Sequence, residues 1–218
     1  DNGIIILEDP SLLECLKRNT YDQFYNEHIY VFSYISLSNI LKKHGLAIFH
    51  LENIKDHGGS IRYYIKKISS NFKIANSVKI QKRKEINFGL NSFLTYKKFS
   101  DRVEGSKRKL VALFKKLKKR KKNIIGYGAT AKAVTVLNYC KIDNKYIDYF
   151  VDTTPEKQGK YMPGVKIPVK KYFKLNKNKI DYAFLGAWNF KSEIRSKEQK
   201  FISKKGKFIT HIPIPKVI

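Results

Sequence analysis

Apolar and polar positions near the start of the chain predict a short run of strands and helices. The apolar run at residues 3–7 predicts a strand that ends at Asp9-Pro10, and Ser11 and Ser38 are suitable N-caps for helices. Gly58-Gly59 joins two strand-like runs closely, so we expect these two strands to be antiparallel. The predicted order is strand, helix, helix, strand, strand, over residues 3–7, 12–17, 39–43, 46–51 and 61–65.

The middle of the chain differs from its start in composition and in the spacing of apolar residues. Residues 69–84 are polar and basic, which predicts a linker. Residues 86–121 carry apolar positions three or four apart, which predicts one long helix that Gly105-Ser106 can interrupt. The Lys- and Arg-rich run at 115–122 closes this helix. Cations suit a helix C-terminus, so we interpret the run as a solvated face rather than a recognition surface.

Strands and helices alternate from Asn123 onward, which predicts a small parallel, Rossmann-like sheet. The fold class is therefore α/β, and we divide the chain into residues 1–68, a linker at 69–84, and a C-terminal domain at 85–218 that opens with the long helix. The predicted strands and helices of this last part cover residues 124–125, 129–139, 146–151, 181–187, 190–204 and 207–212.

The charge is strongly positive, with 45 Lys and Arg against 18 Asp and Glu, a net charge of +27. Most of these cations are Lys, which makes bidentate contacts to bases and phosphates poorly. We interpret the excess as compositional drift that favours anionic substrates, without specific nucleic-acid binding. Nonspecific nucleic-acid binding is the alternative, and it predicts an affinity that falls steeply with salt.

Cysteine content and hydropathy indicate a cytoplasmic protein with no membrane span. The two cysteines, Cys15 and Cys140, exclude a disulfide framework and a cysteine-only zinc site, and each lies in an apolar helical pattern typical of a buried thiol. No signal peptide is visible, and no apolar run approaches the roughly 20 residues of a spanning helix. The sequence opens with Asp1-Asn2-Gly3 and enters a strand at once, so we expect it to be a fragment.

A glycine-rich turn is the first candidate site. The segment from Gly126 to Lys132, GYGATAK, follows a predicted strand and opens a helix, and Asp152 ends the next strand. This G-x-G-x-x-A pattern satisfies the dinucleotide fingerprint, in which glycines let the backbone approach a diphosphate. Lys132 adds a cation that suits phosphate. The alternative is a tight strand-to-helix turn that binds nothing.

A second candidate is the long loop at 152–164, which contains Lys157 and follows the carboxyl end of a strand, where α/β sheets bind ligands. Its alternative interpretation is a rigid surface loop.

Two further segments offer acid–base chemistry. Tyr25-Asn26-Glu27-His28 places a phenol, a carboxylate and an imidazole within four residues, and His is the side chain best suited to proton abstraction near neutral pH. His57-Gly58-Gly59-Ser60 lies close to Arg62. A structural Glu-His pair and a glycine hairpin with an incidental His are the alternatives.

Taken together, these segments resemble one family, the S-adenosylmethionine-dependent sugar C-methyltransferases, which methylate C-3 of nucleotide-linked 4-keto deoxysugars. The matching motifs occur in the family's order along nearly the whole chain. They are YNEH at 25–28, HGGSIR at 57–62, GYGATAK at 126–132, LNY at 137–139, the loop from Asp152 to Pro168, AWN at 187–189 with Glu193-Ile194, and IPIP at 212–215.

The resemblance implies three parts: an N-terminal zinc module, a class I methyltransferase domain and a C-terminal Rossmann-like domain. Residues 1–68 resemble only the last part of the methyltransferase domain, and residues from about 85 resemble the C-terminal domain that would hold the nucleotide sugar. We therefore expect most of the S-adenosylmethionine site to lie outside this chain, with zinc confined to the N-terminal module and no metal here. By itself the chain is expected to be inactive.

The resemblance also implies residue roles. His28 would remove the proton beside the ketone, Glu27 would orient it or help to position the sugar, and Tyr25 would donate to the ketone or enolate oxygen. Asn26 stands where the family usually has another His. The residues implied in substrate binding are His57, Ser60 and Arg62 around the sugar and Gly126, Gly128, Lys132, Asp152 and Lys157 around the nucleotide diphosphate.

An alternative stays open beside this interpretation. A non-catalytic, Rossmann-like module that binds a nucleotide sugar or a dinucleotide would explain the glycine turn and Asp152, but it would leave Tyr25, Glu27 and His28 without a role.

Overall fold

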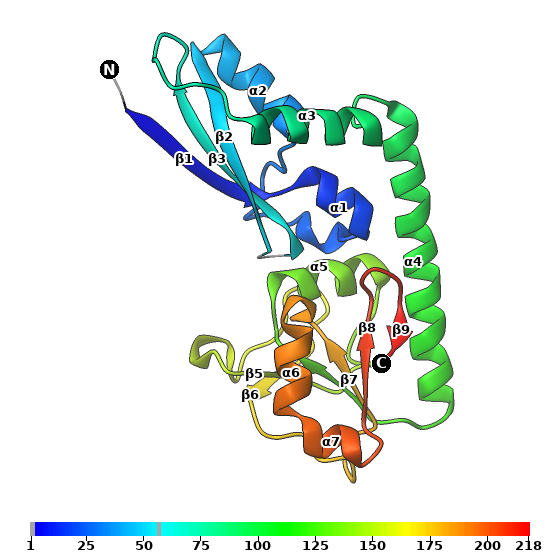
Figure 1. Cartoon of the computed structure of the whole chain (residues 1–218). Coiled ribbons are helices and arrows are strands. Elements are labelled where there is room, and N and C mark those ends of the chain that lie inside the picture. Colours follow the sequence, from blue (N-terminus) through cyan, green and yellow to red (C-terminus); the bar gives the residue numbers. More distant parts are fainter. Residues whose placement is uncertain (1–2, 56–57) are drawn as a thin grey trace. The chain divides into compact units, whose positions relative to one another are not determined.

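The structure is a computed structural model that describes residues 3–55 and 58–218 (Figure 1). The chain folds into two compact units and passes between them within helix α4 (Phe93–Lys119). The first unit comprises Asp1–Thr20 and Asn26–Asp101, and the second comprises Tyr21–Tyr25 and Arg102–Ile218.

The first unit contains a three-stranded sheet in the order β1-β3-β2, formed by β1 (Ile4–Pro10), β2 (Leu46–Ile54) and β3 (Ser60–Lys67). Strand β3 is antiparallel to both neighbours, which confirms the expected antiparallel pair. Strand β1 ends at Pro10, at the expected Asp9-Pro10 boundary, and Pro10 still pairs with Ser60 in register. Proline is tolerated there because β1 lies at an edge of this sheet, where a missing N–H need not interrupt a ladder.

Helices α1 (Leu12–Arg18) and α2 (Tyr34–Lys43) follow the predicted order. Ser11 caps α1 as expected, because its hydroxyl accepts a hydrogen bond from the backbone N–H of Glu14. The predicted cap at Ser38 is wrong. Helix α2 begins earlier, where Ser33 and Ser36 form a reciprocal capping box.

Helix α3 (Asn76–Phe88) occupies most of the segment expected to be a linker. Its polar composition hid a partly buried face that includes Val78 and Glu85. The Glu85 carboxylate accepts hydrogen bonds from the backbone N–H groups of Tyr34 (2.8 Å) and Ile35 (3.0 Å) at the start of α2. Long-range pairing of this kind leaves no periodic signal in the sequence.

The predicted helix over 86–121 is two helices. Helix α3 ends at Gly89, whose φ of +83° suits a C-cap, and α4 then runs without a break through Gly105. The apolar core of the first unit lies between its sheet and helices α2 and α3 and consists of Leu37, Ile48, Leu51, Ile61, Tyr63, Ile65 and Val78.

The second unit is built on a six-stranded sheet in the order β6-β5-β4-β7-β8-β9, parallel except for β9. The predicted α/β class with a parallel sheet is confirmed. The two outer strands, β6 and β9, escaped prediction because they are only two or three residues long and rich in Lys. The strands are β4 (Ile124–Tyr127), β5 (Phe150–Asp152), β6 (Val169–Lys171), β7 (Tyr182–Leu185), β8 (Lys207–Thr210) and β9 (Lys216–Val217).

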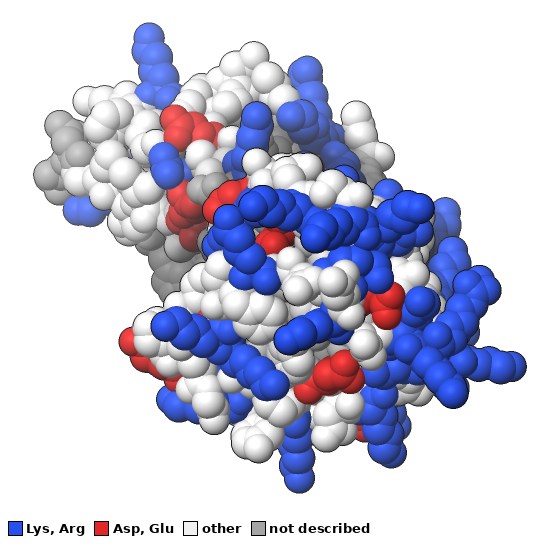
Figure 2. All heavy atoms as spheres, turned by 90° about the horizontal axis from the view of Figure 1, so that it is seen from below, with Lys and Arg blue, Asp and Glu red and all other residues white. Residues whose placement is uncertain are grey.

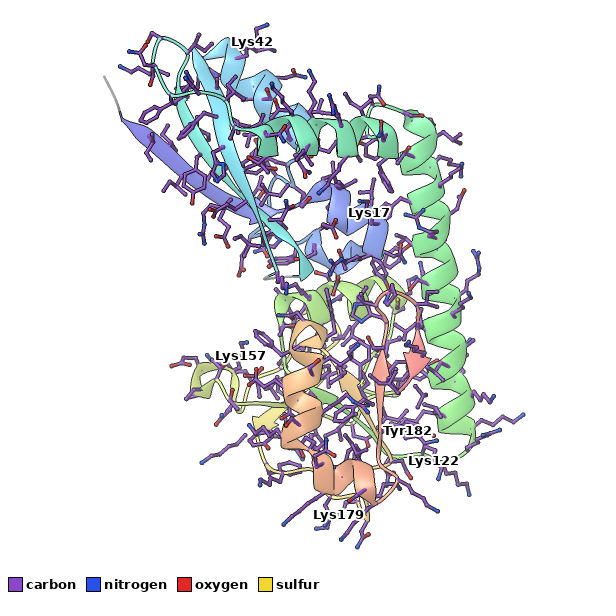
Figure 3. All side chains as sticks on the ribbon, viewed as in Figure 1. Lys17, Lys42, Lys122, Lys157, Lys179 and Tyr182 are labelled. Atoms are coloured by element: carbon purple, nitrogen blue, oxygen red, sulfur yellow. The ribbon has the colours of Figure 1, made fainter. Side chains whose placement is uncertain are left out.

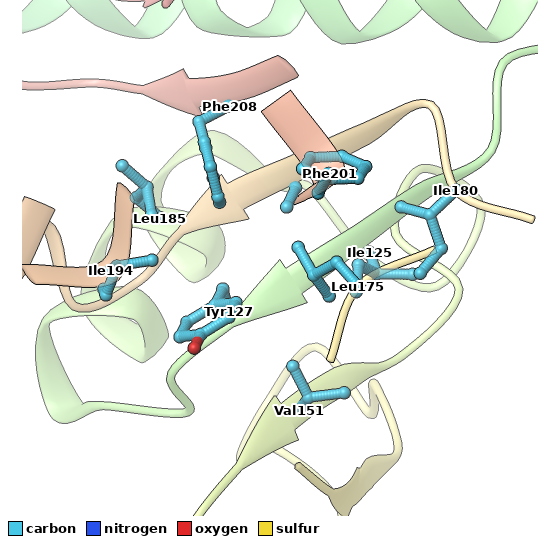
Figure 4. Close-up of a cluster of buried hydrophobic side chains, with 10 residues drawn as sticks. Ile125, Tyr127, Val151, Leu175, Ile180, Leu185, Ile194, Phe201 and Phe208 are labelled. Atoms are coloured by element: carbon cyan, nitrogen blue, oxygen red, sulfur yellow. The ribbon is translucent and has the colours of Figure 1, made fainter. Parts of the chain in front are cut away.

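Helices cover both faces of this sheet. On one face, Ile194 and Phe201 pack into a buried cluster with Ile125, Tyr127 and Phe208 (Figure 4). On the other, the α4 residue Phe114 lies with its ring centroid 5.9 Å from that of Phe184 in β7. Besides α4, the unit contains η1 (Tyr21–Gln23), α5 (Ala131–Cys140), η3 (Pro155–Lys157), η4 (Trp188–Phe190), α6 (Lys191–Lys197) and α7 (Gln199–Ser203), so the helix predicted over 190–204 is divided.

Candidate functional site

The second unit contains a pocket of about 290 Å³ at the carboxyl ends of its parallel strands. The strand order reverses beside β4, because β5 and β6 lie on one side of it and β7 and β8 on the other. Open α/β sheets bind ligands at such a switch point. The lining includes Gly128 and Thr130 after β4, Asp152, Thr154 and Lys157 in and after β5, Tyr172 after β6, Ala187 and Phe190 after β7, and Glu193 and Lys197 from α6.

Both glycines of the predicted turn are required by their surroundings. Gly128 has a φ of +81°, and a Cβ there would lie 2.8 Å from the Cβ of Ala187. A Cβ on Gly126 would lie 2.3 Å from ring atoms of Phe150. Gly128 lines the pocket, whereas Gly126 contacts the buried ring and is not among the lining residues. The pattern therefore has a packing explanation as well as a ligand-binding one.

Asp152 binds the protein's own backbone at this turn. Its carboxylate accepts hydrogen bonds from the N–H groups of Ala129 (2.7 Å) and Thr154 (2.8 Å), and Lys157 Nζ lies 3.7 Å from the Asp152 Oδ2 atom. The hydroxyl of Thr130 caps α5 by accepting from the N–H of Ala133. The backbone N–H of Ala129 therefore already donates to Asp152, whereas in a dinucleotide-binding turn such an N–H group would donate to a phosphate.

The two predicted lysines of the second unit lie in different surroundings. Lys157 projects from the loop after β5, at the pocket (Figure 3). Lys132 is buried in α5, with 6% of its surface exposed. The structure thus brings Gly128, Asp152 and Lys157 together at one pocket and places Gly126 and Lys132 behind it.

The far wall of the pocket is aromatic and carries a cation, neither of which the sequence analysis singled out. The Tyr172 hydroxyl donates to Glu198 at 2.8 Å, and Lys197 Nζ lies 3.8 Å from the centroid of the Tyr172 ring. Burial and the contact with Glu198 raise the pKa of Tyr172 to about 12, so its hydroxyl keeps its proton. Such a wall suits a flat or anionic ligand. These residues come from separate elements, so no local motif marked them.

The segment Tyr25-Asn26-Glu27-His28 lies between η1 and α2. Tyr25 belongs to the second unit, and Glu27 and His28 belong to the first. Glu27 is exposed, whereas Tyr25 and His28 are half-buried.

Within the first unit, His28 acts electrostatically on Asp9, at the carboxyl end of β1. Burial raises the pKa of Asp9, and the charge of His28 and a hydrogen bond from the Phe32 backbone oppose that rise. From the sequence, Asp9 was used only to mark a strand end. Its position at the carboxyl end of β1 is the signal that could have marked it as a candidate site residue.

Ser60 and Arg62, from the fourth candidate segment, lie on β3. Ser60 is buried opposite Pro10. Arg62 forms ion pairs with Glu8 (2.8 Å) and Glu52 (3.5 Å), and its hydrogen bond to Glu8 raises the pKa of the guanidinium. His57 lies outside the described residues.

Positive charge covers much of the surface seen from below in Figure 2, where Lys and Arg far outnumber Asp and Glu. At the amino ends of the strands, a groove of about 660 Å³ collects five cationic side chains around Asp181, which pairs with Lys177 at 2.7 Å and with Lys122 at 3.4 Å. A field of this sign attracts anionic ligands over several ångströms and weakens with salt.

Comparison with known proteins identifies the family. Residues 55–213 match the family described as the C-methyltransferase C-terminal domain. The chain belongs to this family. It is also similar to the C-methyltransferase NovU of Streptomyces niveus, with 33% identity over 217 residues, which is 100% of this chain and 52% of that relative.

The resemblance drawn from the motifs is thereby confirmed, and this C-methyltransferase family member spans about half the length of the curated relative that it matches. Within residues 3–55 and 58–218, no helix is long and apolar enough to cross a membrane. The same residues contain no group of three or more His, Cys, Asp or Glu side chains placed to hold a metal ion.

Proposed function

We propose that this chain supplies the proton-abstracting segment and the substrate-holding domain of an S-adenosylmethionine-dependent C-methyltransferase that acts on a nucleotide-linked keto-deoxysugar. The match of residues 55–213 to the C-methyltransferase C-terminal domain carries the proposal. The activity of the whole relative is part of the proposal, because the chain covers 52% of it.

The two sheets support this assignment of parts. In the first unit, the antiparallel β3 lies between β1 and β2, an arrangement that suits the end of a class I methyltransferase sheet, and Ile4, Ile5 and Ile6 of the edge strand β1 are about half exposed. In the second unit, the strand order around β4 is that of a Rossmann-like domain.

In this proposal the chain's own residues carry the proton chemistry. The carbon beside a ketone is a weak acid, so its proton leaves only if a base is in place and the resulting enolate oxygen is stabilised. His28 takes the proton, Glu27 orients the imidazole or helps to position the sugar, and the Tyr25 hydroxyl donates to the enolate oxygen.

The described residues do not fit the methyl donor. Among the described residues, the glycine turn most resembles a cofactor-binding loop. The space beside Gly128 that a Cβ would occupy, however, is filled by the side chain of Ala187. The backbone N–H of Ala129 already donates a hydrogen bond to Asp152. S-adenosylmethionine supplies an electrophilic methyl group, and in our proposal most of its site lies outside this chain.

The pocket beside β4 is proposed to hold the nucleotide part of the substrate. Lys157 and Lys197 supply positive charge for a diphosphate, and Tyr172 supplies a flat apolar surface. Gly128 and Asp152 shape the pocket floor. On β3, Ser60 and Arg62, together with His57, are proposed to shape the sugar end.

The proton step has a direct test in the full gene product that contains this chain. With a 4-keto sugar nucleotide in D₂O, the wild type should exchange the proton beside the ketone and, with S-adenosylmethionine added, transfer a methyl group. His28→Asn should lower both rates by about 10²–10⁴-fold, the usual contribution of a general base. His44→Asn is the matched control, because His44 is an exposed residue at the C-terminal end of α2. Full exchange by His28→Asn would refute the assigned base.

A second candidate function is binding without catalysis. The pocket is formed entirely by residues of the second unit, so this candidate function requires that unit alone. This alternative predicts calorimetric binding of the sugar nucleotide, with neither proton exchange nor methyl transfer by the wild type.

A further inference from the structure

A short segment that ends at Tyr25, the first of the proposed catalytic residues, belongs to the second unit. Residues 21–25 belong to that unit, although the chain on both sides of them belongs to the first. The helix η1 within this segment is almost completely buried, with Asp22 0% exposed. Tyr25 follows Asp22 by three positions, so contacts that hold Asp22 also fix the backbone from which Tyr25 projects.

Asp22 connects two loops at the carboxyl edge of the parallel sheet. Its Oδ2 atom accepts a hydrogen bond from Trp188 Nε1 at 2.5 Å and lies 2.9 Å from His211 Nε2. Trp188 follows β7 directly after Ala187, which lines the pocket, and His211 follows β8. The carboxylate of η1 is therefore tied to the same edge of the sheet as the pocket.

Tyr21 holds the other side of η1. Its hydroxyl lies 3.4 Å from Ser106 Oγ on α4, and its ring makes edge contacts with Tyr139 on α5 (centroids 5.7 Å apart) and with His211 (5.9 Å apart). Four elements of the second unit thus fix the position and orientation of this one helical turn.

The Asp22 contacts are better suited to positioning than to stability. Within the parts of the chain that the structure describes, Asp22 Oδ1 and His211 Nδ1 are buried without a hydrogen-bond partner. A buried carboxylate with hydrogen bonds to only one of its oxygens contributes little to the free energy of folding. Apolar side chains of similar volume often stabilise a fold more. Buried polar atoms without hydrogen-bond partners are rare, and they are found at functional sites more often than elsewhere. The two hydrogen bonds that Asp22 does make are directional, so they fix its orientation.

We propose that Asp22 is a positioning residue for the methyl-transfer reaction. Through Trp188 and His211 it fixes the segment whose next residues are Tyr25, Glu27 and His28. The second unit then not only holds substrate but also determines where Tyr25 lies. This inference rests on the proposed function, because the position of Tyr25 matters for catalysis only if Tyr25 takes part in the proposed reaction.

Anchoring is tested on the chain without any activity assay. Trp188 is the only Trp, so its indole N–H gives a single NMR resonance that reports directly on the contact with Asp22. Asp22→Asn should shift this resonance and speed amide hydrogen exchange at residues 24–28 by at least about tenfold. Asp181→Asn makes the same chemical change at a less deeply buried carboxylate of the same unit and should change neither. Unchanged exchange at residues 24–28 in Asp22→Asn would overturn the proposal.

The catalytic consequence is tested in the full gene product. Asp22→Asn should lower kcat about 100-fold, the effect of a small misplacement of reacting groups, with KM for the sugar nucleotide within about threefold. Trp188→Phe removes only the indole donor and should lower kcat less, which keeps the test informative if Asp22→Asn folds poorly. A kcat that Asp22→Asn leaves unchanged would refute the proposal. A wild type with no methyl transfer or proton exchange would instead refute the proposed function, and the exchange data would still decide the anchoring.

Discussion

Replacing Gly126 with alanine tests whether the glycine turn is set by packing or by a ligand. An added Cβ would lie 2.3 Å from the Cε1 and Cζ atoms of Phe150 and 2.4 Å from Cδ1. Carbon atoms in contact prefer about 3.5–4.0 Å, so the ring has to move by more than about 1 Å. Phe150 is 0% exposed and packs against Phe184, so there is no free space for this movement.

The expected cost follows from these contacts. Overpacking a well-filled core costs about 1–3 kcal/mol, and this clash involves several ring atoms, so we take the upper end. Alanine restricts the unfolded chain more than glycine does, which offsets about 0.4–1 kcal/mol. The net loss is about 2 kcal/mol, which lowers Tm by roughly 4–8 °C for a chain of this size.

Gly105→Ala is the matched control because it makes the same chemical change where space is open. At Gly105 in α4 the nearest atom to an added Cβ is Arg108 Nη2 at 4.0 Å. Alanine favours an interior helix position over glycine by about 0.8–1 kcal/mol, so this variant should melt roughly 2–4 °C above the wild type. Differential scanning calorimetry and urea titration of the three proteins provide the measurement.

A second-site change separates packing from ligand binding. Phe150→Ala removes all three ring atoms that clash, Cδ1, Cε1 and Cζ, so the cost of Gly126→Ala should largely vanish in the double variant when it is compared with Phe150→Ala alone. The reasoning would be refuted if Gly126→Ala melted within 1 °C of the wild type on this scale of roughly 4–8 °C, or if the two changes were simply additive. Wild-type stability with lost binding of a nucleotide sugar would assign Gly126 to the ligand instead.

Two further predictions concern buried or partly buried carboxylates. Glu85→Gln should destabilise the first unit by about 1.5–3 kcal/mol, because the Tyr34 and Ile35 N–H groups lose a charged acceptor; an unchanged urea midpoint would contradict this. Burial raises the pKa of Asp181, but hydrogen bonds from Lys177 and from the Asn123 backbone outweigh that effect and lower the pKa below its ordinary value of 3.8. Asp181 therefore stabilises the fold above about pH 4, and this contribution is lost as the pH falls below that value. The urea midpoints of the wild type and of Asp181→Asn should converge as the pH falls from about 4 to about 3. A difference between the two midpoints that stays constant over this range would refute the argument.

Local patterns were enough where a signal is confined to one element. The Ser11 cap, the antiparallel pair around Gly58-Gly59 and the parallel α/β class followed from spacing and turn chemistry, and the structure confirms each of them. The motifs also indicated the C-methyltransferase family, which the match of residues 55–213 confirms. In all of these cases the signal consists of short stretches, each of which can be interpreted without knowing what it contacts in the fold.

Tertiary contacts decided the rest. Helix α3 escaped prediction because its buried Glu85 is satisfied by the start of another helix, and the start of α2 was misplaced because Ser33 and Ser38 look alike as caps until the backbone is folded. Asp152 accepts a hydrogen bond from the glycine turn only because β5, which carries Asp152, pairs with β4.

The sequence by itself determined the chemistry that is available: a His, a Glu and a Tyr in one segment, a glycine turn, and an excess of positive charge. Only the tertiary structure decided which groups are already occupied and which segments are held in place, as when Asp22 meets Trp188 and His211 from far along the chain. The physical reason is that hydrogen-bond satisfaction and close packing are properties of pairs of segments. The cost of closing the loops between such segments depends on topology, which a single stretch of sequence does not encode.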